Sequence, residues 1–133
     1  MTQKQLDPDP SWNIYIKAAL GKKVIAPVIL DLRGLTSIAD IFIILSGRSN
    51  RQVMAIAEHI KQDLKKQGHV PLNIEGKQEG LWILLDYGHV VIHVFYDTLR
   101  SFYDLEGLWC DAKRVKTKNL LEYEKKLKQE LIP

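Results

Sequence analysis

The sequence lacks several features that would assign it to a class at once. It contains one cysteine, Cys110, and a single thiol can build neither a disulfide framework nor a thiolate metal site. The apolar run over residues 41–45 is of strand length, far below the roughly 20 residues that span a bilayer. Residues 1–10 hold two aspartates and no apolar stretch, so they resemble neither a secretory signal nor a transit peptide. We therefore expect a cytoplasmic protein with no membrane contact.

What the chain does contain is sufficient for one folded domain. Hydrophobic residues make up 46% and charged residues 26% of the 133 positions, which favours a buried core over disorder. The net charge of +3 is mildly basic and suits work near RNA, although many proteins without a nucleic-acid partner match it. We expect a loose N-terminal tail over residues 1–10, a folded domain over 11–112 and a basic, amphipathic C-terminal helical extension over 113–133.

Periodic segments predict an α/β (α+β) fold, namely a mixed β-sheet of about five strands flanked by helices. Strands are expected over residues 24–31, 40–46, 70–74, 81–87 and 90–95, and helices over 11–20, 49–68, 98–104 and 117–131. Pro27 indicates that the first strand starts late or lies at an edge. Ser11 is expected to cap the first helix, and Ser49 with Gln52 forms a capping box before the second.

The strands over 81–87 and 90–95 give the clearest hairpin signal, and Gly88 at the first loop position suits a type II′ turn. The two-residue loop fixes the register, so that one face carries only apolar or aromatic pairs: Tyr87 with Val90, Leu85 with Ile92 and Ile83 with Val94. The other face pairs Asp86 with Val91, Leu84 with His93 and Trp82 with Phe95. Packing beneath a helix explains this mixture, and so does a contact surface, where aromatics gather with a few polar groups.

The segment over 100–109 follows the hairpin and repeats that mixture. Its Tyr103, Leu105, Leu108 and Trp109 are hard to bury fully in so small a domain if the stretch is loop-like. An apolar patch left outside usually marks a partner site. The segment therefore favours a binding surface beside the hairpin.

Sequence patterns that carry metal binding or nucleophilic catalysis are missing. The four histidines, His59, His69, His89 and His93, show no zincin spacing. Cys110 has neither a second thiol nor an identifiable base partner, and a lone cysteine is more often inert. We expect no catalytic residue, no metal and no cofactor.

A candidate anion site joins the strand over 40–46 to the next helix. A helix N-terminus attracts anions, and the residues at this junction are Ser46, Arg48, Ser49 and Arg51. The chain has no Walker-type loop or dinucleotide fingerprint, and no well-placed carboxylate pair for the metal ions of nucleotidyl transfer. Ser49 as a plain helix cap is the simpler interpretation. A nucleotide-binding or nucleotidyl-transfer enzyme stays an alternative.

Basic residues cluster before the last predicted helix. This cluster consists of Lys113, Arg114, Lys116 and Lys118. It could touch RNA phosphates, and it could equally be a solvated linker. An RNA-binding module that uses this segment is a second alternative.

Several motifs together resemble the ribosomal silencing factor family, whose members are also called Iojap-like proteins. They are IADIFIILSGRS at 38–49, RQV at 51–53, EG at 75–76, WILLDYG at 82–88, VVIHVF at 90–95, Arg100 and YDLEGLW at 103–109. The resemblance runs from about residue 11 to residue 112, and residues 113–133 extend beyond the usual family core.

The resemblance implies a nucleotidyltransferase-like fold without the catalytic carboxylates, and hence a protein that is not an enzyme. It also implies binding to the large ribosomal subunit through ribosomal protein fourteen, which blocks association with the small subunit and represses translation. The family contact region corresponds to Trp82, Asp86, His93, Tyr103, Leu105, Glu106, Leu108 and Trp109. Phe95 and Arg100 complete the partner-binding surface that we expect, with Asp86, Glu106 and Arg100 setting orientation. When free, the protein is expected to be a monomer or a weak homodimer, and a peripheral contact with ribosomal RNA stays open.

Overall fold

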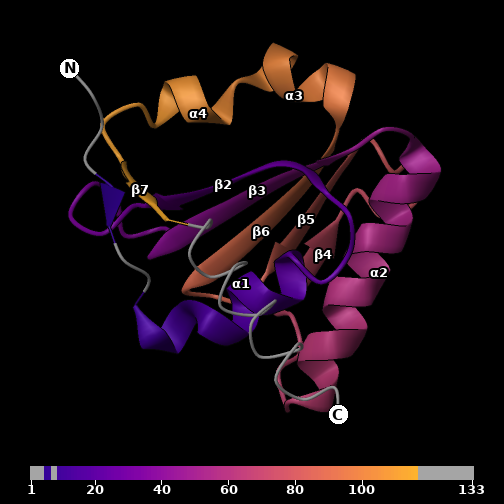
Figure 1. The fold of residues 1–133 in the computed structure, drawn as a ribbon, viewed down its shortest axis with the longest axis horizontal. Coiled ribbons are helices and arrows are strands. Elements are labelled where there is room, and N and C mark those ends of the chain that lie inside the picture. Colours follow the sequence, from indigo (N-terminus) through magenta and orange to yellow (C-terminus); the bar gives the residue numbers. More distant parts are fainter. Residues whose placement is uncertain (1–4, 7–8, 117–133) are drawn as a thin grey trace, which may run out of the picture.

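The computed structural model describes residues 5–6 and 9–116. Within these residues a seven-stranded sheet has the order β1-β7-β2-β3-β6-β5-β4. The sheet lies between two layers of helices, with α1 (Asn13–Ala19) and α2 (Asn50–Lys66) on one side and α3 (Asp97–Tyr103) and α4 (Leu105–Leu108) on the other (Figure 1). The predicted α/β class, with helices flanking a mixed sheet, is confirmed.

The five predicted strands form the middle and one edge of the sheet. They are β2 (Ile25–Asp31), β3 (Ile41–Gly47), β4 (Asn73–Glu75), β5 (Trp82–Asp86) and β6 (Val90–Tyr96). β3 runs parallel to β6, whereas β2 pairs with β3, β5 with β6 and β4 with β5 in antiparallel fashion. Every residue of β3 is buried, as a continuous apolar run in a sheet covered on both faces requires. The register of β2 shifts between Ile25 and Val28, around Pro27, because proline cannot donate to a ladder.

Two short strands were not predicted. β7 (Lys113–Val115) pairs antiparallel with β2, and β1 (Gln5–Leu6) lies parallel to β7. These residues were expected in the C-terminal extension and in the loose tail. Strands of three and two residues are too short to show the alternation by which a strand is recognised. The predicted helix over 117–131 lies outside the described residues.

The helix starts depend on side-chain caps, one of which differs from the prediction. The first helix is preceded by a short 3-10 turn, η1 (Pro10–Trp12), and it is Asp9 Oδ1 that accepts from the Ser11 N–H at 2.9 Å, so Ser11 is not the cap. The cap of α2 is confirmed, because Ser49 Oγ accepts from the Gln52 N–H at 3.1 Å. The Gln52 side chain does not close a capping box on Ser49, since its Oε1 accepts from the Arg48 N–H at 2.6 Å.

The sheet separates two hydrophobic cores. The larger core packs α1 and α2 on one face of the sheet, through residues such as Ile16, Ile60 and Ile92. The smaller one lies on the α3–α4 side around Phe42 and Phe95, with Trp82 and Trp109 partly buried against it. Three aromatic residues of the predicted partner surface, Trp82, Phe95 and Trp109, therefore lie on the side of the smaller core. No helix among the described residues is long and apolar enough to cross a membrane.

Candidate functional site

The hairpin adopts the predicted register. Trp82 pairs with Phe95, Leu84 with His93, and Asp86 with Val91. Gly88 has a φ of 91°, the left-handed conformation that its loop position requires. Asp86 Oδ1 accepts from the Gly88 N–H at 2.8 Å, so this carboxylate stabilises the turn. Trp82, Leu84 and Asp86 alternate on one face of β5 and are all half-buried. That face of β5 is therefore only partly covered.

The segment after the hairpin is helical and not loop-like. α3 follows β6 without a gap, and Asp104, with a φ of 46°, ends α3 and caps α4. Asp104 Oδ1 accepts from the Gly107 N–H at 3.1 Å. A Cβ atom at position 107 would lie 2.1 Å from Asp104 Oδ2, so a larger residue here would displace the capping carboxylate. The helix predicted over 98–104 is thus present as α3, whereas α4 was not predicted, because a helix of four residues is too short for its periodicity to stand out in the sequence.

Arg100 holds this helical pair against the sheet. Arg100 as a whole is 8% exposed, and its Nε donates to Glu106 Oε1 at 2.7 Å. Its Nη1 donates to Ser46 Oγ at 3.0 Å, at the end of β3. A buried guanidinium with charge-assisted hydrogen bonds fixes geometry well. Arg100 therefore positions α3 and α4, and in this conformation it is not open to a partner.

An aromatic cluster fills the space between β5, β6 and α3. The Trp82 ring stacks on Phe95 at a centroid distance of 4.8 Å and packs against Tyr103 at 4.7 Å. Trp82 Nε1 donates to His93 Nδ1 at 3.1 Å. Phe42 lies edge-on to His93 at 4.6 Å. Such contacts add to the stabilisation that burial of the rings provides.

His93 is neutral at physiological pH. Burial lowers the pKa of His93 from its ordinary value of 6.5 to about 4. Because Nδ1 accepts from Trp82, the proton of the neutral ring is on Nε2. The Nε2 atom is buried without a hydrogen-bond partner among the described residues. His93 and Phe95 are thus buried beneath the predicted partner surface and do not reach a partner in this conformation.

The open part of the predicted surface belongs to α3 and α4. Leu108 is 71% exposed and Tyr103 47%, while Leu105, Glu106 and Trp109 are half-buried. Phe102, 79% exposed, was not among the predicted site residues. Its place next to Tyr103 in an aromatic stretch was a signal in the sequence, but its high exposure follows only from the orientation of α3 on the sheet. We define the α3–α4 surface as Phe102, Tyr103, Leu105, Leu108 and Trp109.

The candidate anion site does not come together as expected. Ser46 is fully buried and its hydroxyl is engaged by Arg100, while Ser49 serves as the cap of α2. Arg48 and Arg51 remain, with exposed side chains. Within residues 5–6 and 9–116, no three His, Cys, Asp or Glu side chains gather as metal ligands would. The structure therefore provides only two surface arginines for an anion at this junction.

Comparisons with known proteins find the same family that the sequence motifs resemble. The family model described as "Ribosomal silencing factor during starvation" matches residues 5–131, which includes β1, β7 and the segment beyond. A ribosomal silencing factor of Halalkalibacterium halodurans is 39% identical over 109 residues, covering 82% of this chain and 93% of that protein.

A solved structure and a more distant relative extend the comparison. The crystal structure of a protein from Bacillus halodurans matches with a TM-score of 0.71 and 34% identity, covering 80% of this chain and 97% of that one. The mouse protein named "Mitochondrial assembly of ribosomal large subunit protein 1" is 36% identical over 73 residues, which is 53% of this chain and 32% of that protein.

Proposed function

Because the chain belongs to the ribosomal silencing factor family, we propose that it binds the large ribosomal subunit through that subunit's ribosomal protein fourteen. In this proposal the bound protein keeps the small subunit from joining and so represses translation in the cytoplasm. The family name supports association with the ribosome, and the name of the mouse relative refers to its large subunit. The protein acts by binding and not by catalysis.

The exposed apolar side chains of the α3–α4 surface carry this proposal. Phe102, Tyr103 and Leu108 are exposed large hydrophobic residues on one short stretch of chain. Three such side chains within residues 102–108, followed by the half-buried Trp109, are the kind of exposed apolar feature that favours a protein-binding site. Aromatic anchors of this type supply most of the affinity in known interfaces.

The α3–α4 surface is also fixed in place before a partner arrives. The Arg100 side chain joins Glu106 of α4 to Ser46 of β3, and the Asp104 carboxylate caps α4. Trp82 packs against Tyr103 from the sheet. Since little ordering remains to be done on binding, more of the contact energy appears as affinity.

Steric exclusion needs no more than this surface. A domain of this length is roughly 30 Å across, so a copy bound on the joining face of one subunit would hold the other away. An interface of standard size buries about 1,600 Å² in total, which is compatible with micromolar or tighter binding. The mechanism therefore requires a docked protein and no chemical step.

A matched pair of leucine variants tests the proposal. Leu108→Ala truncates a 71% exposed side chain of the α3–α4 surface, whereas Leu72→Ala truncates a 77% exposed one beside β4. Neither should disturb folding, because neither residue is in a core. In pull-downs with purified large subunits, Leu108→Ala should bind less and Leu72→Ala as well as wild type. Sucrose gradients should show the same ranking in the amount of joined ribosome. Equal amounts of joined ribosome with and without excess wild-type protein would refute steric exclusion.

A further inference from the structure

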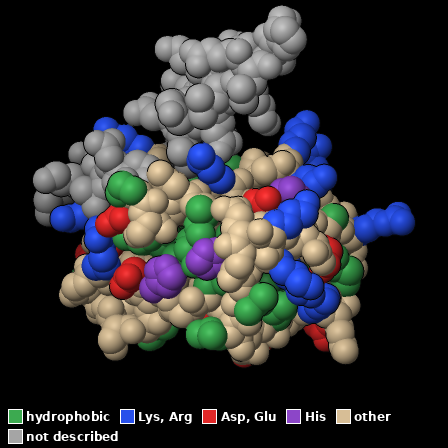
Figure 2. All heavy atoms as spheres, turned by 90° about the horizontal axis from the view of Figure 1, so that it is seen from below, with side chains coloured by type: hydrophobic (Ala, Val, Ile, Leu, Met, Phe, Trp, Pro, Cys, Tyr) green, Lys and Arg blue, Asp and Glu red, His purple; other side chains and the backbone are tan. Residues whose placement is uncertain are grey.

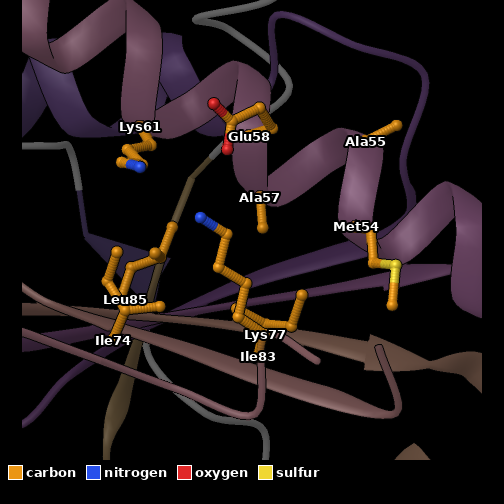
Figure 3. Close-up of a pocket in the computed structure, with 9 residues that line it drawn as sticks. All are labelled: Met54, Ala55, Ala57, Glu58, Lys61, Ile74, Lys77, Ile83 and Leu85. Atoms are coloured by element: carbon orange, nitrogen blue, oxygen red, sulfur yellow. The ribbon is translucent and has the colours of Figure 1, made fainter. Parts of the chain in front are cut away.

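A cavity lies on the other side of the sheet, between α2 and the strands β4 and β5 (Figure 3). Its volume is about 360 Å³, within the range of small-molecule sites. Its walls are formed by Met54, Ala55, Ala57, Glu58 and Lys61 from α2 and by Ile74, Lys77, Ile83 and Leu85 from the strand side. None of these residues belongs to the α3–α4 surface or to its supports.

The inner part of the cavity is apolar because β5 and α2 both present apolar side chains to it. Ile83 and Leu85 alternate along β5 with the residues of the opposite face and are each 1% exposed. Facing them, α2 presents Ala57 one turn after Met54. The short side chain of Ala57 leaves room that a larger residue would fill. An apolar space of this size favours an apolar ligand.

Lys77, which lines the cavity, belongs to a constrained loop that follows the Glu75-Gly76 motif. Gly76 has a φ of 78°, and a Cβ atom there would lie 1.9 Å from the Trp82 carbonyl oxygen. Gly80 has a φ of 66° and approaches α2, since its Cβ would lie 2.8 Å from the Asn50 carbonyl oxygen. The Gly80 N–H also donates to the Gly76 carbonyl at 3.2 Å. The backbone of the loop that carries Lys77 is therefore held in place by close contacts with β5 and α2.

Charged groups meet at the mouth. Figure 3 shows the Lys77 side chain reaching from the strand side toward α2, where Glu58 and Lys61 project from the helix. Glu58 Oε1 accepts from Gln62 Nε2 at 2.8 Å, and this bond, more than the charges of Lys61 and Lys77, lowers the pKa of Glu58. Two ammonium groups and one carboxylate leave one positive charge unmatched. Lys and Arg side chains also predominate on the side of the molecule where α2 lies (Figure 2).

We propose that this cavity binds a small molecule that has an apolar body and one carboxylate. The apolar body lies against Ile83, Leu85 and Ala57, and the carboxylate pairs with Lys77 and Lys61 at the mouth. The net charge of the mouth selects a monoanion over a neutral or cationic analogue of the same shape. This binding is independent of the ribosome, so it can be tested on the isolated protein and succeeds or fails separately from the proposed function.

Titration with sodium octanoate, followed by NMR of the full chain, tests the site. Octanoate has about ten non-hydrogen atoms, for which a dissociation constant on the order of 0.1–1 mM is expected. The methyl signals of Ile74, Ile83 and Leu85 should shift and saturate, while those of the α3–α4 surface stay in place. Octylamine, with the same chain and a positive charge, should bind at least about tenfold more weakly.

Variants separate the two parts of the proposal. Lys77→Glu should weaken octanoate binding about tenfold, whereas Lys66→Glu, near the end of α2 on a different side of the helix from Lys61, should not. Ala57→Leu should fill the cavity and abolish saturable binding, with the dispersion of its spectrum showing that it folds. The proposal is overturned by shifts that do not saturate, by equal binding of octylamine, or by an unchanged affinity in Lys77→Glu. Dilution-dependent shifts of the cavity signals would also overturn it, because a second copy would then cover the cavity.

Discussion

Replacement of Arg100 by alanine separates a positioning role from direct contact with the ribosome. The sequence alone suggested that Arg100 orients a partner, but the structure buries it to 8% exposure between Ser46 and Glu106. Arg100→Ala would leave the buried Ser46 hydroxyl without its donor, which costs about 1–3 kcal/mol. Glu106 would lose a charge-assisted hydrogen bond, although its side chain, 26% exposed, can take up water in compensation. We expect a total loss of about 2–4 kcal/mol in the free energy of unfolding.

The assay for Arg100→Ala compares stability with binding. Urea unfolding should show the loss as a lower midpoint with an unchanged slope. Large-subunit binding at a temperature where the variant is folded should also weaken, because α4 is no longer held to β3. In a double-mutant cycle with Glu106→Gln, the two substitutions should be non-additive, since they remove one shared interaction. The reasoning is refuted if Arg100→Ala weakens binding while the free energy of unfolding stays within about 0.5 kcal/mol of wild type, which would mean that Arg100 contacts the partner itself.

Four further outcomes are expected. The free energy of unfolding should fall as the pH is lowered from 6.5 toward about 4, because the unfolded chain takes up a proton that buried His93 does not; His93→Gln should flatten this slope in a urea series at several pH values. Gly107→Ala should cost about 1 kcal/mol in urea unfolding by displacing the Asp104 cap, and an unchanged midpoint would contradict the cap. Trp109→Ala should weaken large-subunit binding, measured by surface plasmon resonance, by about 2 kcal/mol or more. A chain truncated after Lys116 keeps β7 and should still bind the subunit, whereas complete loss of binding would favour a contact made by residues 117–133.

The elements that could be predicted are those whose signal is local. The hairpin register followed from a two-residue loop and from alternation along 82–86 and 90–96, and each predicted pair on the α3–α4 side is present. The helix α2 followed from its cap at Ser49 and from a stripe of apolar residues over 17 positions. Both depend on residues that are close in the sequence, so no knowledge of the tertiary structure was needed.

What could not be predicted depends on contacts between distant parts of the chain. Ser46 and Arg100 are 54 positions apart, and nothing near either residue indicates that they meet. Ser46 was therefore assigned to an anion site and Arg100 to the partner surface, although each satisfies the other. The β1–β7 pair joins the two ends of the described chain, where strands of two and three residues carry no pattern of their own. Burial of His93 likewise depends on Phe42 of β3, a neighbour that only the sheet order provides.

Alternation along β5 explains how so small a domain can present two separate surfaces. Trp82, Leu84 and Asp86 face the α3–α4 side, while Ile83 and Leu85 face α2 and the cavity. Adjacent residues of one strand thus face different proposed sites, because successive side chains point to opposite faces of a sheet. Substitutions at 82 and 83 should consequently change different measurements, the first subunit binding and the second octanoate binding. In β5, even-numbered residues face the α3–α4 side and odd-numbered residues face the cavity, so neighbours in the sequence need not share a role.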